Sequence, residues 1–301
     1  MAQDLRGFEK YLVDEKRLSV NSVSAYIHDI PGFEAYLGTK GTHSLLHTTG
    51  ADISGYLLKL KSDGRSGATV NRKLASLRAY YRFLIEKNRI KKNPCEGIRS
   101  PRIQRSEIEY LSTEEIDKLL AAPDDSDTGR RDAALLEMMY ATGMRVTEAM
   151  YLKVEDVNIR MGFVTCDGSH GKARIIPLGR MAREALEKYI FENRPHLKRR
   201  SNEASDGPEE SALFLNYYGE RITRQALWKI IRGYAAKVGI DRAITPQILR
   251  NTFAVHMVQG GADIKALQEM MGHEDPMTTQ AYLSVSKNRI KDVYDSAHPR
   301  A

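Results

Sequence analysis

The stretch KKNPCEGIRSPRIQRSEIEY, residues 91–110, separates two differently organised parts of this 301-residue chain. It strings prolines and a glycine among charged residues without a sustained hydrophobic period, which is typical of an exposed connection between domains. The residues that follow, LSTEEI at 111–116, have the pattern of a helix-opening capping box with a hydrophobic staple. We therefore predict a first domain at 1–100, a linker at 101–109 and a second domain at 110–301, because this length naturally divides into two domains.

Upstream of this stretch, apolar residues recur at helical spacing, which predicts an all-helical first domain. The positions that define the period are Phe8, Leu12, Tyr26, Ile30, Phe33, Ile53, Tyr56, Leu57 and Leu60. A further helix is predicted at 69–85, with an apolar stripe of Leu74, Leu77, Tyr81 and Leu84. Largely off that stripe lie Arg72, Lys73, Arg78 and Arg82. This basic face could contact phosphates, and the alternative is an ordinary solvated helix face.

The second domain begins with helical periodicity and changes character over residues 154–178. Two strand-like runs, GFVTC at 162–166 and RIIPL at 174–178, flank the polar, turn-rich DGSHGK. We expect a small hairpin there. Helical patterns resume at 223–238, 246–258, 264–271 and from 278 onward. The predicted fold class is therefore mainly α, with a small β-hairpin or sheet in the C-terminal domain.

Composition bounds the function only loosely. The 46 Lys and Arg exceed the 39 Asp and Glu, and the resulting net charge of +7 favours a polyanionic partner. Cys95 and Cys166 are too few for a disulfide framework and lack metal-site spacing, so buried thiols are expected. No apolar run approaches the roughly 20 residues that span a bilayer, and the first residues lack a secretory pattern. We expect a soluble protein in the reducing cytoplasm.

Three clusters in the second domain carry candidate chemistry: ATGMRVTE at 141–148, TPQILR at 245–250, and MGH at 271–273, followed nine residues later by Tyr282. Each lies at the edge of a predicted helix. A glycine can end one helix before Arg145, and a Thr-Pro pair forms an N-cap and first position before Arg250. Helix N-termini favour anions.

Arginines at such positions can form a pocket for one phosphate, because a planar guanidinium offers two parallel hydrogen bonds. Taken singly, each residue also has an ordinary structural interpretation. Arg145 could pair with Glu148 at i, i+3, Arg250 could be a surface cation, His273 a helix cap and Tyr282 a core residue. The order and separation of the clusters therefore matter more than any one of these residues.

Taken together, ATGMRVTE, TPQILRNTFA and MGHEDPMTTQAYLSVS resemble the signature segments of tyrosine recombinases, most closely those of the bacterial Xer type. The resemblance extends to LSVNSVSAYIHDI near the start and AHPRA at the end, so it covers nearly the whole chain. It implies a two-domain clamp around duplex DNA. A helical, SAM-like core-binding domain would precede a mixed α/β catalytic domain.

The resemblance also implies a reaction: site-specific recombination of DNA through a 3′-phosphotyrosyl intermediate, with neither metal nor ATP as cofactor. Tyr282 would be the nucleophile. Arg145 and Arg250 would stabilise the pentavalent phosphate, and His273 would hydrogen-bond a non-bridging oxygen.

Two departures from the family pattern bear on this chemistry. Gln247 stands where relatives have the histidine of His-x-x-Arg, and an amide donates a hydrogen bond but takes no proton. Asn251, beside Arg250, is a further deviation, because relatives often have another histidine there. On the hairpin, the usual lysine position falls on Ser169, and Lys172 is the lysine that remains at the tip. Lys172 would either protonate the leaving 5′-oxygen or merely contact a backbone phosphate.

Three hypotheses follow. The first is an active recombinase, and the second is a DNA-binding relative whose strand transfer is weakened or lost through Gln247 and Ser169. The third is an unrelated basic helical protein that binds RNA or ribosomes. The resemblance further implies a tetramer on DNA through exchange of a C-terminal helix at 287–294, a nucleoid-associated location in the cytoplasm, and the option of a partner recombinase.

Overall fold

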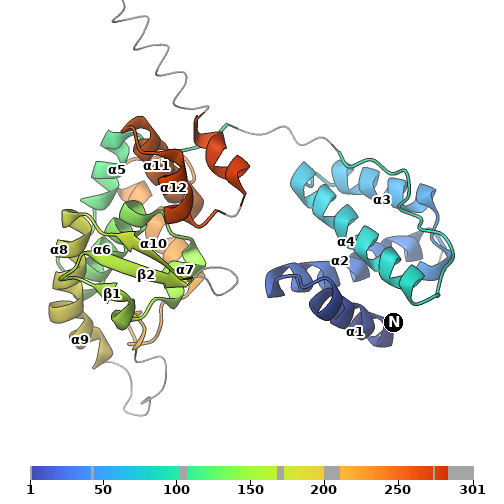
Figure 1. Cartoon of the computed structure of the whole chain (residues 1–301), viewed down its shortest axis with the longest axis horizontal. Coiled ribbons are helices and arrows are strands. Elements are labelled where there is room, and N and C mark those ends of the chain that lie inside the picture. Colours follow the sequence, from blue (N-terminus) through green and yellow to red (C-terminus); the bar gives the residue numbers. More distant parts are fainter. Residues whose placement is uncertain are drawn as a thin grey trace, which may run out of the picture. The chain divides into compact units, whose positions relative to one another are not determined.

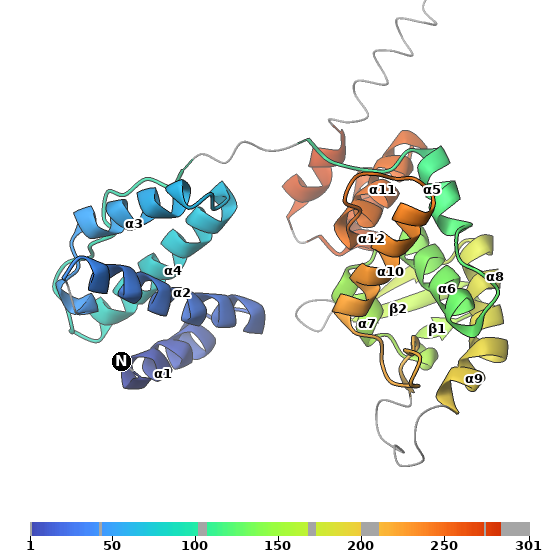
Figure 2. The ribbon, with the colours of Figure 1, turned by 180° about the vertical axis from the view of Figure 1, so that it is seen from behind.

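Figures 1 and 2 show the computed structural model, which describes residues 2–41, 44–101, 107–167, 173–199, 211–273 and 275–283. The chain divides into two compact units, Met1–Ser106 and Glu107–Ala301, here called unit 1 and unit 2. Each has a hydrophobic core of its own, and each is described by itself. Among the described residues, every helix is too short or too polar to cross a lipid bilayer.

Unit 1 is all helical in its described part, as the periodicity predicts. Its elements are α1 (Ala2–Lys10), η1 (Tyr11–Glu15), α2 (Val20–Thr39), η2 (Leu45–His47), α3 (Gly50–Ser62) and α4 (Gly67–Glu86). Hydroxyl side chains of Ser19, Thr49 and Ser66 accept hydrogen bonds from the first turns of α2, α3 and α4, which fixes where these helices begin. The predicted stripe of α4 is confirmed, because Leu74, Leu77, Tyr81 and Leu84 are each at most 1% exposed.

The stretch after α4 is only partly the exposed connection that the sequence predicts: residues 91, 92, 96, 97, 99 and 100 are exposed, but others pack on unit 1. Cys95 is only 4% exposed within the core of unit 1. Asn71 of α4 donates a hydrogen bond of 3.0 Å to the carbonyl oxygen of Pro101, and Arg78 donates to the carbonyl oxygen of Ile98. Residues 95–101 therefore contact α4, because their backbone oxygens find donors on that helix.

Unit 2 combines helices with a three-stranded antiparallel sheet of order β1-β2-β3. Its elements are α5 (Thr113–Leu120), α6 (Asp127–Thr142), α7 (Val146–Tyr151), η3 (Val154–Asp156), β1 (Val157–Asn158), β2 (Phe163–Asp167), β3 (Ala173–Pro177), α8 (Arg180–Lys188), η5 (Tyr189–Asn193), α9 (Arg194–Lys198), α10 (Arg224–Lys237), α11 (Pro246–Gln259) and α12 (Ile264–Met271). Residues 276–283 are also helical. The predicted capping box at the start of α5 is confirmed.

The sheet confirms the predicted hairpin and adds one short strand. Val164 of β2 pairs with Ile176 of β3, and both side chains are fully buried. They share a hydrophobic core with residues of α6 and α8, which lie beside the sheet in Figure 1. The two residues of β1 were missed, because so short a run has no measurable period.

Two tight helix endings position the candidate residues. α6 ends at Gly143, whose φ of +57° is left-handed, and a Cβ there would lie 2.2 Å from the ring of Phe253. Only glycine fits this place. α12 ends at Gly272, whose φ of +62° is also left-handed. The chain thus turns sharply into Arg145 at one point and into His273 at the other.

Candidate functional site

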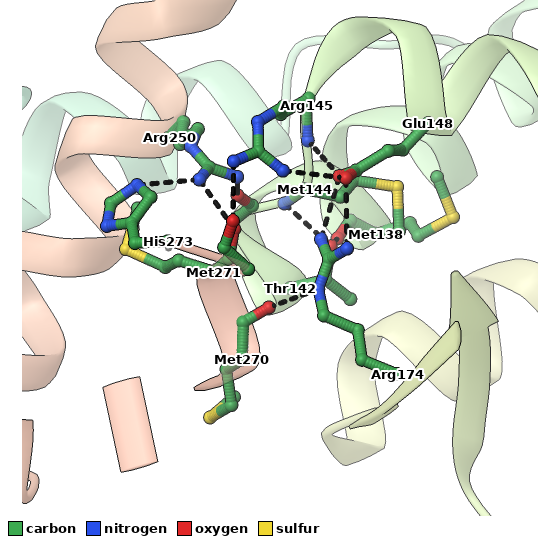
Figure 3. Close-up of polar contacts among 12 residues, drawn as sticks. Met138, Thr142, Met144, Arg145, Glu148, Arg174, Arg250, Met270, Met271 and His273 are labelled. Carbon is green, nitrogen blue, oxygen red and sulfur yellow. Dashed lines mark hydrogen bonds and ion pairs between the residues drawn. The ribbon is translucent and has the colours of Figure 1, made fainter. Parts of the chain in front are cut away.

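Three arginines from distant parts of the chain gather at the C-terminal end of α12 (Figure 3). They donate to three consecutive carbonyl oxygens: Arg174 Nε to Met270 at 2.8 Å, Arg250 Nη2 to Met271 at 2.7 Å, and Arg145 Nη2 to Gly272 at 2.6 Å. The last carbonyls of a helix have no partner within it, and the helix dipole is negative there. The end of α12 is therefore a suitable place to gather cations.

One carboxylate, that of Glu148 on α7, holds two of these arginines. It accepts from Arg174 at 2.9 and 2.7 Å, and from Arg145 through Nη1 at 2.9 Å and the backbone N–H at 2.7 Å. Burial alone would raise the pKa of Glu148, but the bonds from Arg174 and Arg145 lower it below its usual value. The i, i+3 ion pair of Arg145 with Glu148 is thus real, and it lies within the site.

Arg250 on α11 is buried, with 4% of its surface exposed, so the interpretation as a surface cation is wrong. Its guanidinium donates to the carbonyl oxygens of Gly143 and Met271 and contacts His273 Nε2 at 2.8 Å. Burial, together with the charge of Arg145, lowers the pKa of Arg250 to about 10, so the group stays charged at neutral pH. Three guanidiniums with one carboxylate leave an excess of positive charge that suits an anion.

His273 follows the end of α12 and lies between Arg250 and Thr279. Its Nδ1 is 2.8 Å from Thr279 Oγ1. Burial, then the charges of Arg250 and Arg145, lower the pKa of His273 to about 4, so the ring is neutral at pH 7. Because a guanidinium only donates, Nε2 accepts from Arg250 and the ring proton is assigned to Nδ1, which donates to Thr279.

Tyr282 lies in helical residues 276–283 and is 5% exposed. Its ring stacks on that of His273, with centroids 6.5 Å apart and planes at 11°. The phenol donates a hydrogen bond of 3.1 Å to Asn251 Oδ1. Burial raises the pKa of Tyr282, and the charge of Arg250 opposes that rise. Tyr282 is therefore both a core residue and a neighbour of the arginine cluster.

Gln247 is exposed in the first turn of α11. Its Nε2 donates at 2.9 Å to Asn251 Oδ1, the same oxygen that receives the Tyr282 phenol. Asn251 Nδ2 in turn donates at 3.1 Å to the carbonyl oxygen of Glu109. Both departures from the family pattern on α11 thus meet in one hydrogen-bond cluster beside Tyr282.

The sequence comparisons agree with this geometry. The profile described as "Phage integrase family" matches residues 109–289, which is more than half of the chain. A second, "Phage integrase, N-terminal SAM-like domain", matches residues 5–88. The chain belongs to the phage integrase family. The hypothesis of an unrelated basic helical protein is thereby wrong.

Relatives in this family are similar along their whole length. The chain is 41% identical over 298 residues to "Tyrosine recombinase XerD" of Oceanobacillus iheyensis, covering 99% of this chain and 98% of the relative. It is 40% identical to "Tyrosine recombinase XerD" of Listeria innocua, covering 98% of each. At this similarity the protein is a tyrosine-type site-specific recombinase.

Solved structures of lower identity share the fold of this phage integrase family member. A XerH site-specific recombinase bound to a palindromic difH substrate has a TM-score of 0.74 at 21% identity, covering 95% of this chain and 82% of that one. A lambda integrase dimer bound to a COC′ core site has a TM-score of 0.73 at 17% identity, covering 94% of each. The fold, a helical part followed along the chain by a mixed α/β part, is therefore that of the family.

Two residues of this candidate site were not identified from the sequence. Arg174 was considered only as the first residue of a strand-like run, and Thr279 was not considered. The one local signal for Arg174 is a charged side chain in an otherwise apolar strand, which is costly to bury without a partner. Lys172 and Ser169 lie outside the described residues. Arg174, two positions after Lys172, contacts Glu148 at the arginine cluster.

The four basic residues of α4 differ in their surroundings. Asp29, 1% exposed, receives Arg72, Lys73 Nζ at 2.9 Å and Ser76 Oγ at 2.8 Å. Burial would raise the pKa of Asp29, but Lys73 and Arg72 lower it below its usual value. Arg78 contacts the residues after α4, including Ser100 Oγ at 3.1 Å, and Arg82 is exposed. Arg72, Lys73 and Arg78 therefore have hydrogen-bonding partners within unit 1, whereas Arg82 is exposed.

The expectation that the two cysteines are buried thiols is confirmed. Cys95 and Cys166 are free and buried, and burial raises the pKa of each thiol to about 12. Within the described residues, no group of three histidine, cysteine or acidic side chains is placed to hold a metal ion.

Proposed function

We propose that this recombinase cuts and rejoins DNA strands through a covalent bond between Tyr282 and the 3′-phosphate of the cleaved strand. The observation that carries the proposal is the convergence of Arg145, Arg250, His273 and Tyr282, which come from the start of α7, from α11 and from the segment after α12. Hydrogen bonds or ring contacts connect Arg250 to His273 and His273 to Tyr282. Such convergence of cations and a phenol suits nucleophilic attack on a phosphodiester.

In the proposed reaction the Tyr282 oxygen attacks phosphorus and loses its proton. The bond from phosphorus to the 5′-oxygen breaks, and that oxygen takes up a proton to become a 5′-hydroxyl. Attack by the 5′-hydroxyl of a partner strand reverses both steps and releases Tyr282. One phosphodiester is consumed and one is formed, so ATP is not required.

The arginines supply the electrostatic stabilisation. Negative charge grows on the non-bridging oxygens of the pentavalent phosphate, and preorganised guanidiniums stabilise it. Arg145 has 36% of its side chain exposed and can meet a phosphate at the surface, whereas Arg174 at 13% and Glu148 at 8% hold it in place. We expect the phosphate to replace His273 Nε2 as a partner of Arg250. The single ring proton would then move from Nδ1 to Nε2 by exchange with solvent, so that Nε2 donates to the phosphate and the Thr279 hydroxyl donates to Nδ1.

Proton transfer is assigned to Lys172, with contact to a backbone phosphate as its alternative role. Gln247 is proposed to donate a hydrogen bond to phosphate. Since Gln247 cannot exchange a proton near neutral pH, the reaction is expected to be slower than with histidine at that position.

For the rest of the chain we propose a DNA-binding domain at 1–100, a linker at 101–109 and a catalytic domain at 110–301. Arg72, Lys73, Arg78 and Arg82 would contact phosphates of duplex DNA.

A XerH structure and a lambda integrase structure are bound to DNA, and one lambda integrase structure is a tetramer on a Holliday junction. By analogy we propose a DNA-bound tetramer in the bacterial cytoplasm at the nucleoid, with residues 287–294, which lie outside the described residues, as an exchanged helix. A partner recombinase is a further option.

The test uses a nicked suicide substrate carrying a candidate site, in buffer with a metal chelator. A covalent protein–DNA adduct should form with the wild-type chain and disappear in Tyr282→Phe, which should still bind the DNA. DNA binding without any adduct would contradict the proposal and favour the binding-only alternative. In that case, restored cleavage by Gln247→His together with Ser169→Lys would locate the defect.

A further inference from the structure

The Asn251 side chain joins three segments of unit 2. Its Oδ1 receives the Tyr282 phenol at 3.1 Å and Gln247 Nε2 at 2.9 Å, while its Nδ2 donates to Glu109 O at 3.1 Å. A carbonyl oxygen only accepts, so the contact with Glu109 fixes the orientation of the amide. The oxygen of Asn251 therefore faces the phenol, and both of its lone pairs are used.

This arrangement determines what the phenol can do. Tyr282 is 5% exposed, and its hydroxyl points at an amide oxygen, which cannot take up a proton. A hydrogen bond to the neutral form of an acid also disfavours its ionised form. In this position the Tyr282 oxygen keeps its proton, which it donates to an oxygen that is not a base.

We propose that Asn251 is a positioning residue that holds the Tyr282 phenol in a resting position, from which it is released before it attacks DNA. The proposal rests on the proposed role of Tyr282 as the nucleophile. Gln247 stabilises this orientation, because its Nε2 donates to the second lone pair of Asn251 Oδ1. Rotation of the Asn251 amide would therefore break two hydrogen bonds. A histidine at position 251 could accept the phenol proton, whereas the amide holds the phenol without activating it.

Two substitutions of similar size separate this role from a purely structural one. Asn251→Asp keeps an acceptor for the phenol but loses the donor to Glu109. Asn251→Leu loses both. A merely structural role in tying Glu109 to α11 predicts equal effects, because both variants lack that bond. Asn251→Ala serves as a second acceptor-free variant if the leucine prevents folding.

The first measurement is the single-turnover rate of adduct formation on the nicked substrate at saturating DNA. Asn251→Leu should react roughly 2- to 10-fold faster than the wild type, the size expected for loss of one net hydrogen bond that opposes release. Asn251→Asp should react no faster than the wild type, because a carboxylate holds the phenol by a stronger, charge-assisted hydrogen bond and, with an ordinary pKa of about 4, is a much weaker base than an imidazole. An unchanged or slower rate in the acceptor-free variants, or equal acceleration in both types, overturns the proposal.

The second measurement follows the phenol without DNA, by tetranitromethane nitration and peptide mass spectrometry. Tyr282 should become more reactive in Asn251→Leu and stay protected in Asn251→Asp. Tyr189 is fully buried, with its hydroxyl bonded to Leu213 O at 3.1 Å, and should stay unreactive in every variant. Equal nitration of Tyr282 in the wild type and Asn251→Leu overturns the proposal. This outcome is distinct from a wild type that forms no adduct, which overturns the proposed function instead.

Discussion

Both units pair cations with a buried carboxylate, but the cations of unit 2 lie deeper and are compensated differently. In unit 1, Arg72 and Lys73 share the carboxylate of Asp29, with 41% and 16% of their side chains exposed. In unit 2, Arg145 and Arg174 share Glu148, and Arg174 is 13% exposed. Arg250 is deeper still, at 4%, and within the described residues it hydrogen-bonds carbonyl oxygens and an imidazole without an ion pair to a carboxylate.

The difference indicates what each cluster is prepared for. A buried cation with neutral partners is stabilised further when an anion arrives, because the lost hydration is then replaced by an opposite charge. Arg250 is therefore suited to the proposed site, which a phosphate would complete. Arg72, being more exposed and already paired, is suited to attract DNA at the surface, where each contact contributes less.

The largest expected effect is that of removing the uncompensated cation. Arg250→Ala should lower the single-turnover rate of adduct formation by about 10²- to 10³-fold, because a preorganised donor to the developing charge is lost. Arg72→Ala should stay near the wild-type rate at saturating DNA. Rates with nicked substrate would check this, with circular dichroism confirming that both variants fold. Equal losses in the two variants would show that the clusters do not differ in role.

Removing the carboxylate of Glu148 or of Asp29 tests how far each one stabilises the cations around it. Glu148→Gln should destabilise unit 2 by about 3 kcal/mol, because two buried or half-buried guanidiniums lose their counterion. The single tryptophan, Trp228, lies in α10 of unit 2, so its fluorescence in a urea titration follows that unit. Asp29→Asn should leave the Trp228 transition in place while lowering the stability of unit 1, followed by amide exchange of α4. A shift of the Trp228 transition in Asp29→Asn would contradict the claim that each cluster stabilises only its own unit.

Acid should weaken unit 2 through His273. Its pKa falls from an ordinary value of 6.5 to about 4 in the folded protein, so the unfolded chain binds the proton more readily. The contribution of neutral His273 to the stability of unit 2 is then complete above pH 6.5. It is lost as the pH falls from 6.5 to about 4. The Trp228 transition should show this loss, and His273→Gln should make the stability less dependent on pH in this range.

Below pH 4.5, the ordinary pKa of Glu148, a further loss of stability should follow, because the pKa of that carboxyl is lowered in the folded protein.

The smallest effects concern single phosphate contacts of unit 1. Arg82→Ala should weaken DNA binding similarly for all sequences and reduce the slope of log K against log salt by about 1. Arg82→Lys, which keeps the charge, is the matched control and should leave the slope unchanged. Fluorescence anisotropy at several salt concentrations measures both. An unaltered slope in Arg82→Ala would make that face an ordinary solvated surface.

Local signals in the sequence predicted most of the helices and the hairpin. Ser112 with Glu115, and Thr245 with Pro246, mark helix starts that the structure confirms, because capping depends on residues within one turn. The resemblance to tyrosine recombinases supplied Arg145, Arg250, His273 and Tyr282 as a set. It did not reveal Arg174, whose partner Glu148 lies 26 residues earlier on another element, or Thr279, which meets His273 six residues before it only through the path of the chain after α12.

The sequence by itself determined the division into two parts, the helical period and the types of residue available for phosphate chemistry, because these depend on neighbours along the chain. Only the tertiary structure decided that Arg250 is buried rather than exposed, that Glu148 serves two arginines, and that the Tyr282 phenol donates to Asn251. Burial and hydrogen-bond pairing depend on which distant segments meet, and α12, β3 and the Tyr282 helix meet only in the folded unit.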